Sequence, residues 1–401
     1  MSVSQIAALE VRRLLAGTIE DRVLIYEATN ADETIVVSGS GAQVTVTVNG
    51  NQESFPSADI SRIHINARGG DDLITYNLGR TCTLAGGSGN DTITTTGADT
   101  TMFGGAGDDS LTGGTGFNHY FPDRDSKNGP TQAGDDTMIG TASNEIYYSD
   151  AGSDVIEAGG GPDDGGARDW LYYTRRTAAL RLTLDGIAND GAPSETGNFS
   201  GIEMLFGGSG NDFIDVGDIA IESVDGGAGD DVIVGSPGED ELAGGEGNDT
   251  LVGHAGFDTL HGGNGNDRIC GGAGDDRIDG NQGKNHLYGK GGDDSIHTSG
   301  TSSDEEANYV VGGSGNDRLV TSDPHTTLKG QSGNDGLVFV FSSASNPTAA
   351  VLDGGSGYDH FHFYSDYSED DSFRISTDDQ ANDGRRGTND MANVRFVEFF
   401  L

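Results

Sequence analysis

Acidic side chains recur at intervals of nine residues along the middle of the chain. Between Gly226 and His297 a nine-residue unit repeats eight times without a gap, with an aspartate or asparagine at its sixth position. Carboxylate oxygens at this density suit Ca²⁺ far better than zinc or copper, which favour nitrogen and sulfur ligands. The carboxylates are those of Asp231, Asp240, Asp249, Asp258, Asp267, Asp276 and Asp294, and Asn285 is the exception.

The same unit supplies a second set of oxygen ligands through its glycines. Each copy fits the pattern G-G-x-G-x-D-x-U-x, where U is a large apolar residue. Glycine adopts positive φ angles that other residues resist, and it leaves the neighbouring carbonyl oxygens uncovered. The candidate contributors of carbonyl oxygens are Gly226, Gly229, Gly235, Gly238, Gly244, Gly247, Gly253, Gly256, Gly262, Gly265, Gly271 and Gly274.

The apolar eighth position indicates which elements must hold these groups. It is aliphatic in all eight copies, from Ile233 to Ile296. A six-residue turn followed by a three-residue strand with one inward residue explains this pattern. Two units then make a coil of 18 residues, and successive coils stack as parallel strands about 4.8 Å apart. A flexible Gly/Asp-rich linker would not keep an aliphatic residue at every ninth position.

Stacked coils sort the carboxylates into two columns, one on each side. Neighbours within a column are one coil apart, so two carboxylates and several carbonyls converge on each gap. We expect Asn285 to weaken the site that it shares with Asp267, and Asp294 to end the second column. The predicted calcium pairs are Asp231/Asp249, Asp249/Asp267, Asp240/Asp258, Asp258/Asp276 and Asp276/Asp294.

Looser copies of the unit flank the central block at irregular spacings. An isolated turn offers half a site at most, so these are weaker calcium candidates. Asn118 replaces the acid in one such copy, and fainter echoes end at Asp72, Asp136 and Asp154. The flanking candidate ligands are Asp91, Asp109, Asp212, Asp317, Asp335 and Asp359.

Composition limits the partners and the kind of core. The 401 residues carry 65 acids against 22 bases, a net charge of −43, so nucleic acid is excluded as a partner by repulsion. A hydrophobic fraction of 33% suits a thin core along a solenoid. Adjacent carboxylates about 5 Å apart repel by roughly 3 kcal/mol at an effective dielectric of 20, so the metal-free block is expected to be disordered.

No stretch approaches the length of an apolar membrane span, and no cleaved signal peptide is recognisable at the start. The two cysteines, Cys82 and Cys270, are 188 positions apart, and two unpaired thiols are favoured over a disulfide.

The first 66 residues differ from the rest. The segment VTVTVNGNQESF alternates apolar and polar residues around Asn49-Gly50, which indicates a hairpin with a type I′ turn. DETIVV and ISRIHINA are predicted as further strands, and IAALEVRRLLAG as a short amphipathic helix or disordered leader. We therefore predict an all-β fold, a right-handed parallel β-roll or β-helix solenoid with an N-terminal β-rich cap.

A longer repeat interrupts the solenoid. Ala-Asn-Asp-Gly occurs from Ala188 and from Ala381, and each copy leads to an apolar-Glu-apolar strand, at Glu203 and at Glu398. A structural insert is favoured over extra calcium ligation by Asp190 and Asp383. The predicted organisation is 1–66 leader and β-rich cap, 67–162 degenerate calcium-repeat solenoid, 163–225 insert and repeat, 226–297 eight-unit calcium β-roll, 298–356 interrupted repeats, and 357–401 C-terminal element.

On these nonapeptides, the chain resembles the RTX, or hemolysin-type calcium-binding repeat, family. The resemblance implies multiple Ca²⁺ ions held by aspartates and glycine-turn carbonyls in a parallel β-roll. It also implies a bacterial protein that is secreted, extracellular or on the cell surface, exported by type I secretion and folding outside the cell. Glu398-Phe399-Phe400-Leu401 is similar to the C-terminal secretion signal of that family, and Leu9–Ala16 resembles a leader of large bacterial surface proteins.

Motifs for two common enzyme classes are missing. The sequence has neither the H-E-x-x-H of zinc proteases nor the G-x-S-x-G of lipases. His254, His261, His286 and His297 occupy variable repeat positions and should face solvent, as should His360 and His362. We therefore favour a non-catalytic structural, surface or adhesive module.

A polysaccharide-acting lyase or epimerase is the alternative. Such an enzyme needs an acid, a base and a charge-neutralising group in one cleft. Cell-surface or extracellular polysaccharide is a candidate partner in either case. The cluster with that mix is Asp169, Trp170, Tyr172, Tyr173, Arg175 and Arg176.

Overall fold

The fold is described from a computed structural model of the whole chain. It describes residues 17–97, 99–124, 133–159, 168–219, 221–299, 308–323, 325–341 and 351–365, and the strand backbone of 373–377 and 394–399. The predicted helix or leader before Gly17 and the second Ala-Asn-Asp-Gly segment, with Asp383, lie outside the described residues.

The described residues form strands and turns, with no α-helix among them and one short 3₁₀ turn, η1, at Ser57–Asp59. The prediction of an all-β fold is confirmed. None of these residues belongs to a helix long and apolar enough to cross a membrane. By their contacts the residues divide into two compact units, Met1–Arg176 with Thr183–Phe206, and Thr177–Leu182 with Gly207–Leu401.

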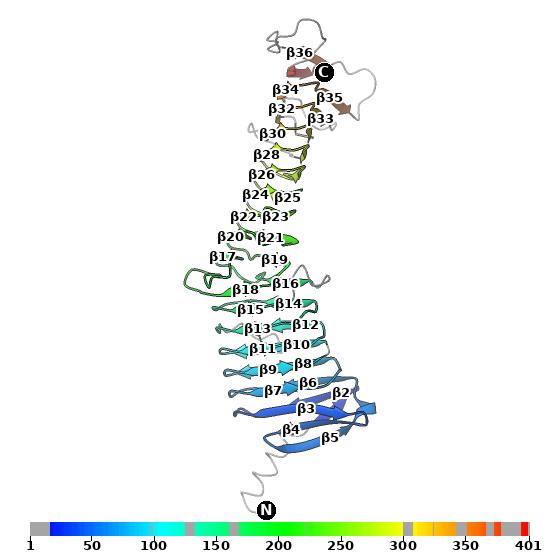
Figure 1. Cartoon of the computed structure of the whole chain (residues 1–401), viewed down its shortest axis with the longest axis vertical. Helices are drawn as coiled ribbons and strands as arrows, with labels where there is room; N and C mark the ends of the chain where they lie inside the picture. Colours follow the sequence, from blue (N-terminus) through cyan, green and yellow to red (C-terminus); the bar gives the residue numbers. More distant parts are fainter. Residues whose placement is uncertain are drawn as a thin grey trace, which may run out of the picture. The chain divides into compact units, whose positions relative to one another are not determined.

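The first unit stacks its strands into two parallel ladders (Figure 1). One ladder contains β2 (Val23–Glu27), β6 (Arg62–Asn66), β8 (Cys82–Ser88), β10 (Thr100–Ala106), β12 (Asn118–Phe121), β14 (Glu145–Tyr148), β16 (Asp169–Tyr172) and β19 (Met204–Phe206). The other contains β3 (Thr34–Ser40), β7 (Leu73–Tyr76), β9 (Thr92–Thr95), β11 (Ser110–Thr112), β13 (Thr137–Ile139), β15 (Val155–Glu157) and β18 (Asn198–Ser200).

The N-terminal cap of this unit is antiparallel. Strand β1 (Thr18–Glu20) pairs with β2, and β3 continues through β4 (Gln43–Val48) and β5 (Asn51–Pro56). Asn49 and Gly50 between β4 and β5 both have positive φ, as the predicted type I′ hairpin requires. The cap also shares the ladders, because β2 and β3 pair in parallel with β6 and β7. It is therefore continuous with the first coil.

The second unit repeats the arrangement of two parallel ladders (Figure 1). One ladder, sheet C, contains β17 (Arg181–Thr183), β20 (Phe213–Asp215), β22 (Val232–Val234), β24 (Thr250–Ala255), β26 (Arg268–Ala273), β28 (His286–Gly291), β30 (Tyr309–Ser314), β32 (Thr327–Ser332) and β34 (Val351–Ser356), with β37 (Val394–Phe399) and β36 (Phe373–Thr377) antiparallel at its end. The facing ladder contains β21 (Ser223–Ala228), β23 (Glu241–Glu246), β25 (Thr259–Asn264), β27 (Arg277–Asp279), β29 (Ser295–Thr298), β31 (Arg318–Thr321), β33 (Gly336–Phe341) and β35 (His360–Ser365).

The core of the repeats is a line of aliphatic side chains, as predicted from the eighth position of the unit. All eight of these residues are fully buried, and each sits opposite its counterpart one coil away, as Leu251 sits opposite Ile269. A thin core of one large residue per strand fits the low hydrophobic fraction of the chain.

The predicted division into six-residue turns and three-residue strands is wrong for most repeats. Strand β23 has six residues, because Gly245 and Glu246 of the following unit still pair in parallel with Gly263 and Asn264. Only the fourth to sixth positions then make the turn. At the fourth position Gly247 has a φ of +132°, and a Cβ there would lie 1.9 Å from the carbonyl oxygen of Gly229, so no larger residue fits.

Candidate metal centre: two columns of buried carboxylates

The sixth-position carboxylates of the central block lie at the turns and are buried, with exposed fractions between 1 and 3%. Consecutive members of a column are tied through one oxygen. The amide of Asp231 donates a hydrogen bond of 2.8 Å to Oδ1 of Asp249, and the amide of Asp249 donates one of 3.0 Å to Oδ1 of Asp267. The prediction of one carboxylate per coil in each column is confirmed for this geometry.

The second column of this unit is longer than predicted. The amide of Asp294 donates to Oδ1 of Asp317 at 2.9 Å, and the series continues through Asp335 to Asp359. The prediction that Asp294 ends the column is wrong. The step from Asp294 to Asp317 spans 23 residues instead of 18, but the strands on either side keep their register. This coil thus contains five residues more than an 18-residue coil, and the strand register is unchanged.

The first column also extends beyond the block, since the amide of Asp212 donates to Oδ1 of Asp231 at 2.7 Å. Asp212 was a candidate from its own motif. The structure thus shows that turns which are isolated in the sequence, such as that of Asp212, belong to the columns.

A comparable column runs along one edge of the first unit. Each backbone amide of this column donates a hydrogen bond to the carboxylate of the next member. The members are, in order, Asp72, Asp91, Asp109, Asp136 and Asp154. The amide of Glu33 in the cap donates to Oδ1 of Asp72 at 2.7 Å. Glu33 was missed because its segment, ATNADETIV, keeps the acid and the aliphatic residue of the unit but none of its glycines.

The opposite edge of the first unit is built differently. The register aligns Cys82, Thr100, Asn118 and Glu145 in one buried column. Protein groups satisfy part of it: Asn118 Nδ2 donates to the carbonyl oxygens of Gly114 and Gly116, and the hydroxyl of Tyr147 donates to Glu145. The column continues to Asp169, and Oδ1 of Asn118 is buried without a hydrogen bond. This edge therefore differs from the aspartate columns in the residue type at each coil.

The open columns leave one carboxylate oxygen per residue without a hydrogen-bond partner. Oδ1 is used by the preceding coil, whereas Oδ2 is buried and has no hydrogen bond. A buried charged oxygen in this state is costly unless a cation or a proton compensates it. The residues concerned are Asp72, Asp91, Asp109, Asp136, Asp231, Asp249, Asp258, Asp267, Asp276, Asp294, Asp317 and Asp335.

In all of these repeats except those of Asp72 and Asp136, the first residue of the unit is a glycine that keeps open a space beside this oxygen. A Cβ placed on Gly226 would lie 2.5 Å from Oδ2 of Asp231 and 2.8 Å from the carbonyl oxygen of Gly244 in the next coil. For Gly244 the corresponding distances, to Asp249 and Gly262, are 2.3 and 2.6 Å. Calcium–oxygen distances are about 2.3–2.6 Å. A carboxylate and a carbonyl thus converge from two coils on a space that suits Ca²⁺.

The remaining candidate glycines lie in the same turns. First-position glycines from Gly226 to Gly271 each border a carboxylate oxygen of their own repeat. The carbonyls of fourth-position glycines such as Gly238, Gly256 and Gly274 face the fourth position of the next coil. Among the described residues no place gathers three or more His, Cys, Asp or Glu side chains that could hold a metal, so backbone carbonyls must complete each site.

Burial shifts the acidity of these carboxyls strongly. Desolvation, with like-charged neighbours adding to it, raises the pKa of Asp231 to about 7, of Asp109 to about 8 and of Asp136 to about 9. Without a cation, each column can lower its charge only by taking up protons.

Several steps of the columns are closed by a protein group. Asn285 Oδ1 accepts from the amide of Asp267, while its Nδ2 donates to the carbonyl oxygen of Gly280 at 2.7 Å. That carbonyl is the one that the Asp267 step would offer to a cation. Ser149 Oγ donates to Oδ2 of Asp154 at 2.6 Å. Each of these groups occupies an oxygen that is open elsewhere in the columns.

Ser236 closes the Asp240 step in the same way. Both its amide and its hydroxyl donate to Asp240, at 2.7 and 3.0 Å. The predicted pair Asp240/Asp258 therefore joins one closed and one open carboxylate.

The candidate catalytic cluster does not come together. Asp169 is fully buried in its column, and Tyr173 is buried at 4% exposure. Arg176 is buried and bonded to Glu195 and to the carbonyl of Asp150, whereas Arg175 is exposed. Tyr172 lies on the outer face, stacked between Tyr148 and Phe206. These side chains point into different environments and share no cleft.

Other predicted features can be placed in the same structure. Cys82 and Cys270 are both free thiols. Oδ1 of Asp190 accepts hydrogen bonds from the amide and hydroxyl of Thr183, which fits a structural insert. His254, His286, His297, His360 and His362 are exposed and His261 is partly exposed, as predicted for variable positions.

The sequence matches a model of the RTX calcium-binding nonapeptide repeat over residues 85–120, 131–156, 198–218, 216–251, 243–278, 261–296 and 303–323. The chain thus carries several copies of the RTX calcium-binding nonapeptide repeat between residues 85 and 323. These repeats imply multiple Ca²⁺ ions, and the parallel β-roll observed here is the fold of such repeats. No curated protein matches the sequence.

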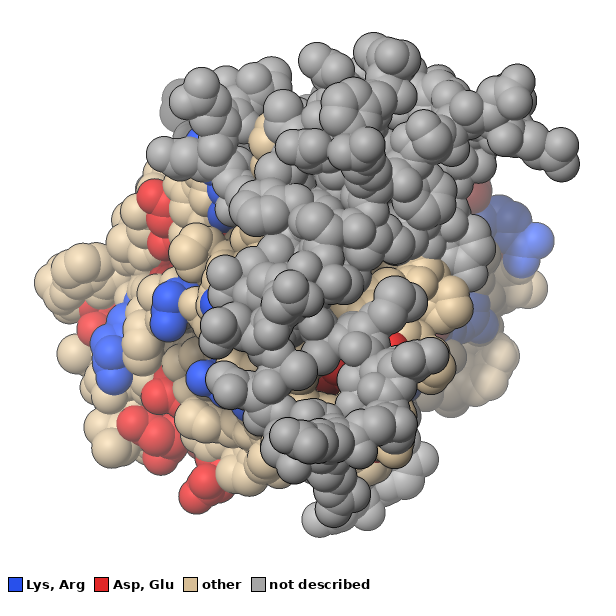
Figure 2. Space-filling view, turned by 90° about the horizontal axis from the view of Figure 1, so that it is seen from above, with Lys and Arg blue, Asp and Glu red and all other residues tan. Residues whose placement is uncertain are grey.

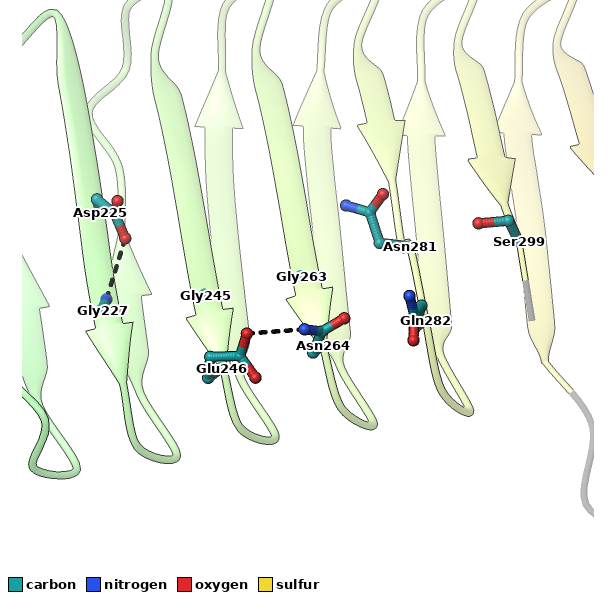
Figure 3. Close-up of a pocket in the computed structure, with 9 residues that line it drawn as sticks. All are labelled: Asp225, Gly227, Gly245, Glu246, Gly263, Asn264, Asn281, Gln282 and Ser299. Atoms are coloured by element: carbon teal, nitrogen blue, oxygen red, sulfur yellow. Dashed lines mark hydrogen bonds between the residues drawn. The ribbon is translucent and has the colours of Figure 1, made fainter. Parts of the chain in front are cut away.

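The RTX coils also form a shallow polar groove of about 430 Å³ outside the first column (Figure 3). Its floor is made of Gly227, Gly245 and Gly263, and Oε1 of Glu246 accepts a hydrogen bond of 2.7 Å from Asn264 on its wall. None of the column carboxylates lines it. The groove is thus separate from the metal columns.

Proposed function

We propose that this protein is an extracellular, non-catalytic structural or surface module whose open columns bind Ca²⁺ and fold on binding it. The observation that carries the proposal is the row of buried Oδ2 atoms without hydrogen bonds, most of them beside a first-position glycine. At Gly226, Gly244 and Gly253 a carbonyl oxygen from the next coil borders the same space. Two negative carboxylates per gap hold a divalent cation well and repel each other without it.

The proposed ligands differ from those predicted from motifs alone. In the second unit they are Asp231, Asp249 and Asp267 in one column, and Asp258, Asp276, Asp294, Asp317 and Asp335 in the other, with first-position glycine carbonyls. In the first unit they are Asp91 and Asp109. Asp72, Asp136 and Glu33 are left out because Ala67, Thr131 and Ala28 stand where the open sites have glycine.

Calcium-gated folding explains an extracellular location in physical terms. Cytosolic calcium is too low to fill sites with dissociation constants of about 10⁻⁴–10⁻³ M, which is the range of extracellular modules. The chain would stay unfolded until exported. To test this location, the folded protein is sought in the medium, on the cell surface and inside the cells of its source. We expect folded protein only outside the cell.

Thermal unfolding in calcium, in magnesium and in chelator tests the function. We expect a large rise in the unfolding temperature with Ca²⁺, because ligands that bind only the folded state stabilise it. Mg²⁺ should do little, because it demands near-octahedral geometry and keeps its waters. Equal unfolding temperatures in calcium and chelator would overturn the proposal.

A further inference from the structure

The outer face of sheet C carries a surface that the calcium columns do not use. Strands β26, β28, β30 and β32 contain no aspartate or glutamate, although acids outnumber bases 65 to 22 in the chain. Figure 2 shows acidic and basic side chains interspersed on the face that it presents. We define the basic strip as Arg268, His286, Tyr288, Lys290, Tyr309 and Lys329.

The members of the basic strip contact one another. The guanidinium of Arg268 and the ammonium of Lys290 lie 5.3 and 5.2 Å from the ring centre of Tyr288. The ammonium of Lys329 lies 5.2 Å from the ring of Tyr309, and the two tyrosine rings are 6.1 Å apart. His286 lies 6.0 Å from Tyr309. The strip is therefore one continuous patch across three coil steps, about 14 Å along the ladder.

The cations of this patch are available to a partner. Arg268 and Lys290 are exposed and Lys329 is partly exposed. None of the three forms an ion pair with a carboxylate of the described residues. Three neighbouring cations that rest on aromatic rings in so acidic a chain keep their charge free for an outside anion.

We propose that the basic strip binds a linear acidic polysaccharide through its carboxylate groups. Potential at a surface is set mainly by charges within a Debye length of about 8 Å, so the acid-free strands attract anions locally despite the overall charge. The attraction is strongest at Arg268 and Lys290, because Asp353 of β34 is in register with Lys329 at the end of the strip. Arginine and lysine bind the carboxylates, and the tyrosine hydroxyls and His286 suit the many hydroxyls of a sugar chain.

A nucleic acid is disfavoured as the occupant. Duplex DNA carries one charge per 1.7 Å of axis, so its charges extend well beyond the strip onto acidic surface. A chain with one carboxylate per sugar has a lower charge density. Calcium in the columns further lowers the repulsion, and in this respect the proposal rests on the proposed function.

Binding of short oligogalacturonates to the calcium-loaded full chain, measured by calorimetry, tests the proposal. We expect binding that weakens with added salt and a loss of affinity of about tenfold or more in the variant R268Q/K290Q/K329Q. The control R62Q/R277Q/R318Q removes three exposed arginines elsewhere and should stay within about twofold of the parent. Neutral oligogalactosides should not bind.

Three results would overturn the proposal: no binding to the folded parent, equal loss in both triple variants, or equally tight binding of a short DNA duplex. Circular dichroism of each variant in calcium checks that the coils still form. If the chain folds on calcium but does not bind the acidic oligosaccharide, only the proposed role of the basic strip is refuted. If calcium does not change the folding of the chain, the proposed function is refuted.

Discussion

Asp231 and Asp249 are joined across one coil by a single hydrogen bond, from the amide of Asp231 to Oδ1 of Asp249, while Oδ2 of each is buried without a hydrogen bond. One oxygen of each carboxyl thus serves the backbone ladder and the other is left for a cation. Because the two oxygens have different partners, one aspartate can both support the backbone and offer a ligand to a metal ion. It also determines which substitutions should matter.

Replacing Asp231 with asparagine should remove calcium affinity more than it harms the coil. An amide at this position can accept through Oδ1 and donate to a glycine carbonyl, as Asn285 does. We expect stability at saturating calcium to fall by about 1–3 kcal/mol, with a much smaller change in chelator. Chemical unfolding in both conditions measures this. Asp230→Asn is the matched control, because Asp230 is exposed and only its Oδ1 is used, by Asn248; an equal loss in the control would contradict the assignment.

The reverse change, Asn285→Asp, should create a calcium site. It frees the carbonyl of Gly280 and supplies a second carboxylate to the Asp267 step. We expect one additional ion by equilibrium dialysis, and a gain of about 2.7 kcal/mol at calcium one hundredfold above the dissociation constant. Stability in chelator should fall. Asn266→Asp, at an exposed position of the preceding coil, should add no ion, and an unchanged ion count in Asn285→Asp would refute the closed-step explanation.

Ser236→Ala should destabilise the chain mainly when calcium is absent. The variant loses the hydroxyl that donates to Asp240 and leaves a buried carboxylate less satisfied, at a cost of about 1–3 kcal/mol. Calcium can compensate that oxygen, so the loss should shrink at saturation. Ser295→Ala, on an exposed strand position, controls for the loss of a hydroxyl. A loss that is the same with and without calcium would count against a role for Ser236 in place of the ion.

The calcium-free protein should be more folded in mild acid than in mild alkali. Burial raises the folded-state pKa of Asp109 to about 8 and of Asp267 to about 7, above an unfolded value near 4. Protonation therefore favours the folded state fully below about pH 4, and this contribution is lost as the pH rises through about 7–8. Circular dichroism in chelator at pH 5.5 and 8.5 measures it.

With calcium present the pH trend should reverse. Protons compete with the cation for Oδ2, so the calcium midpoint should fall as the pH rises. A chelated protein whose β-signal is independent of pH would contradict the burial of ionisable columns.

The nine-residue period predicted the columns and the inward aliphatic line, because each depends on spacing alone. It failed at Asp294, since five extra residues before β30 change the sequence distance to Asp317 but not the register. The period did not predict the role of Ser236, because this residue stands at a variable position of the unit. Its hydroxyl donates a hydrogen bond to Asp240. The column that contains Cys82 and Thr100 could not be predicted, because the residue type differs from coil to coil. Only the strand pairing shows that these residues are aligned.

Far-UV circular dichroism of the full chain during a calcium titration tests the central claim most directly. The open carboxylate columns predict a largely disordered spectrum in chelator at pH 8 and a cooperative gain of β-signal at micromolar to millimolar calcium. A chain that shows its full β-signal in chelator, unchanged by added calcium, would contradict the claim that the buried Oδ2 atoms require the ion.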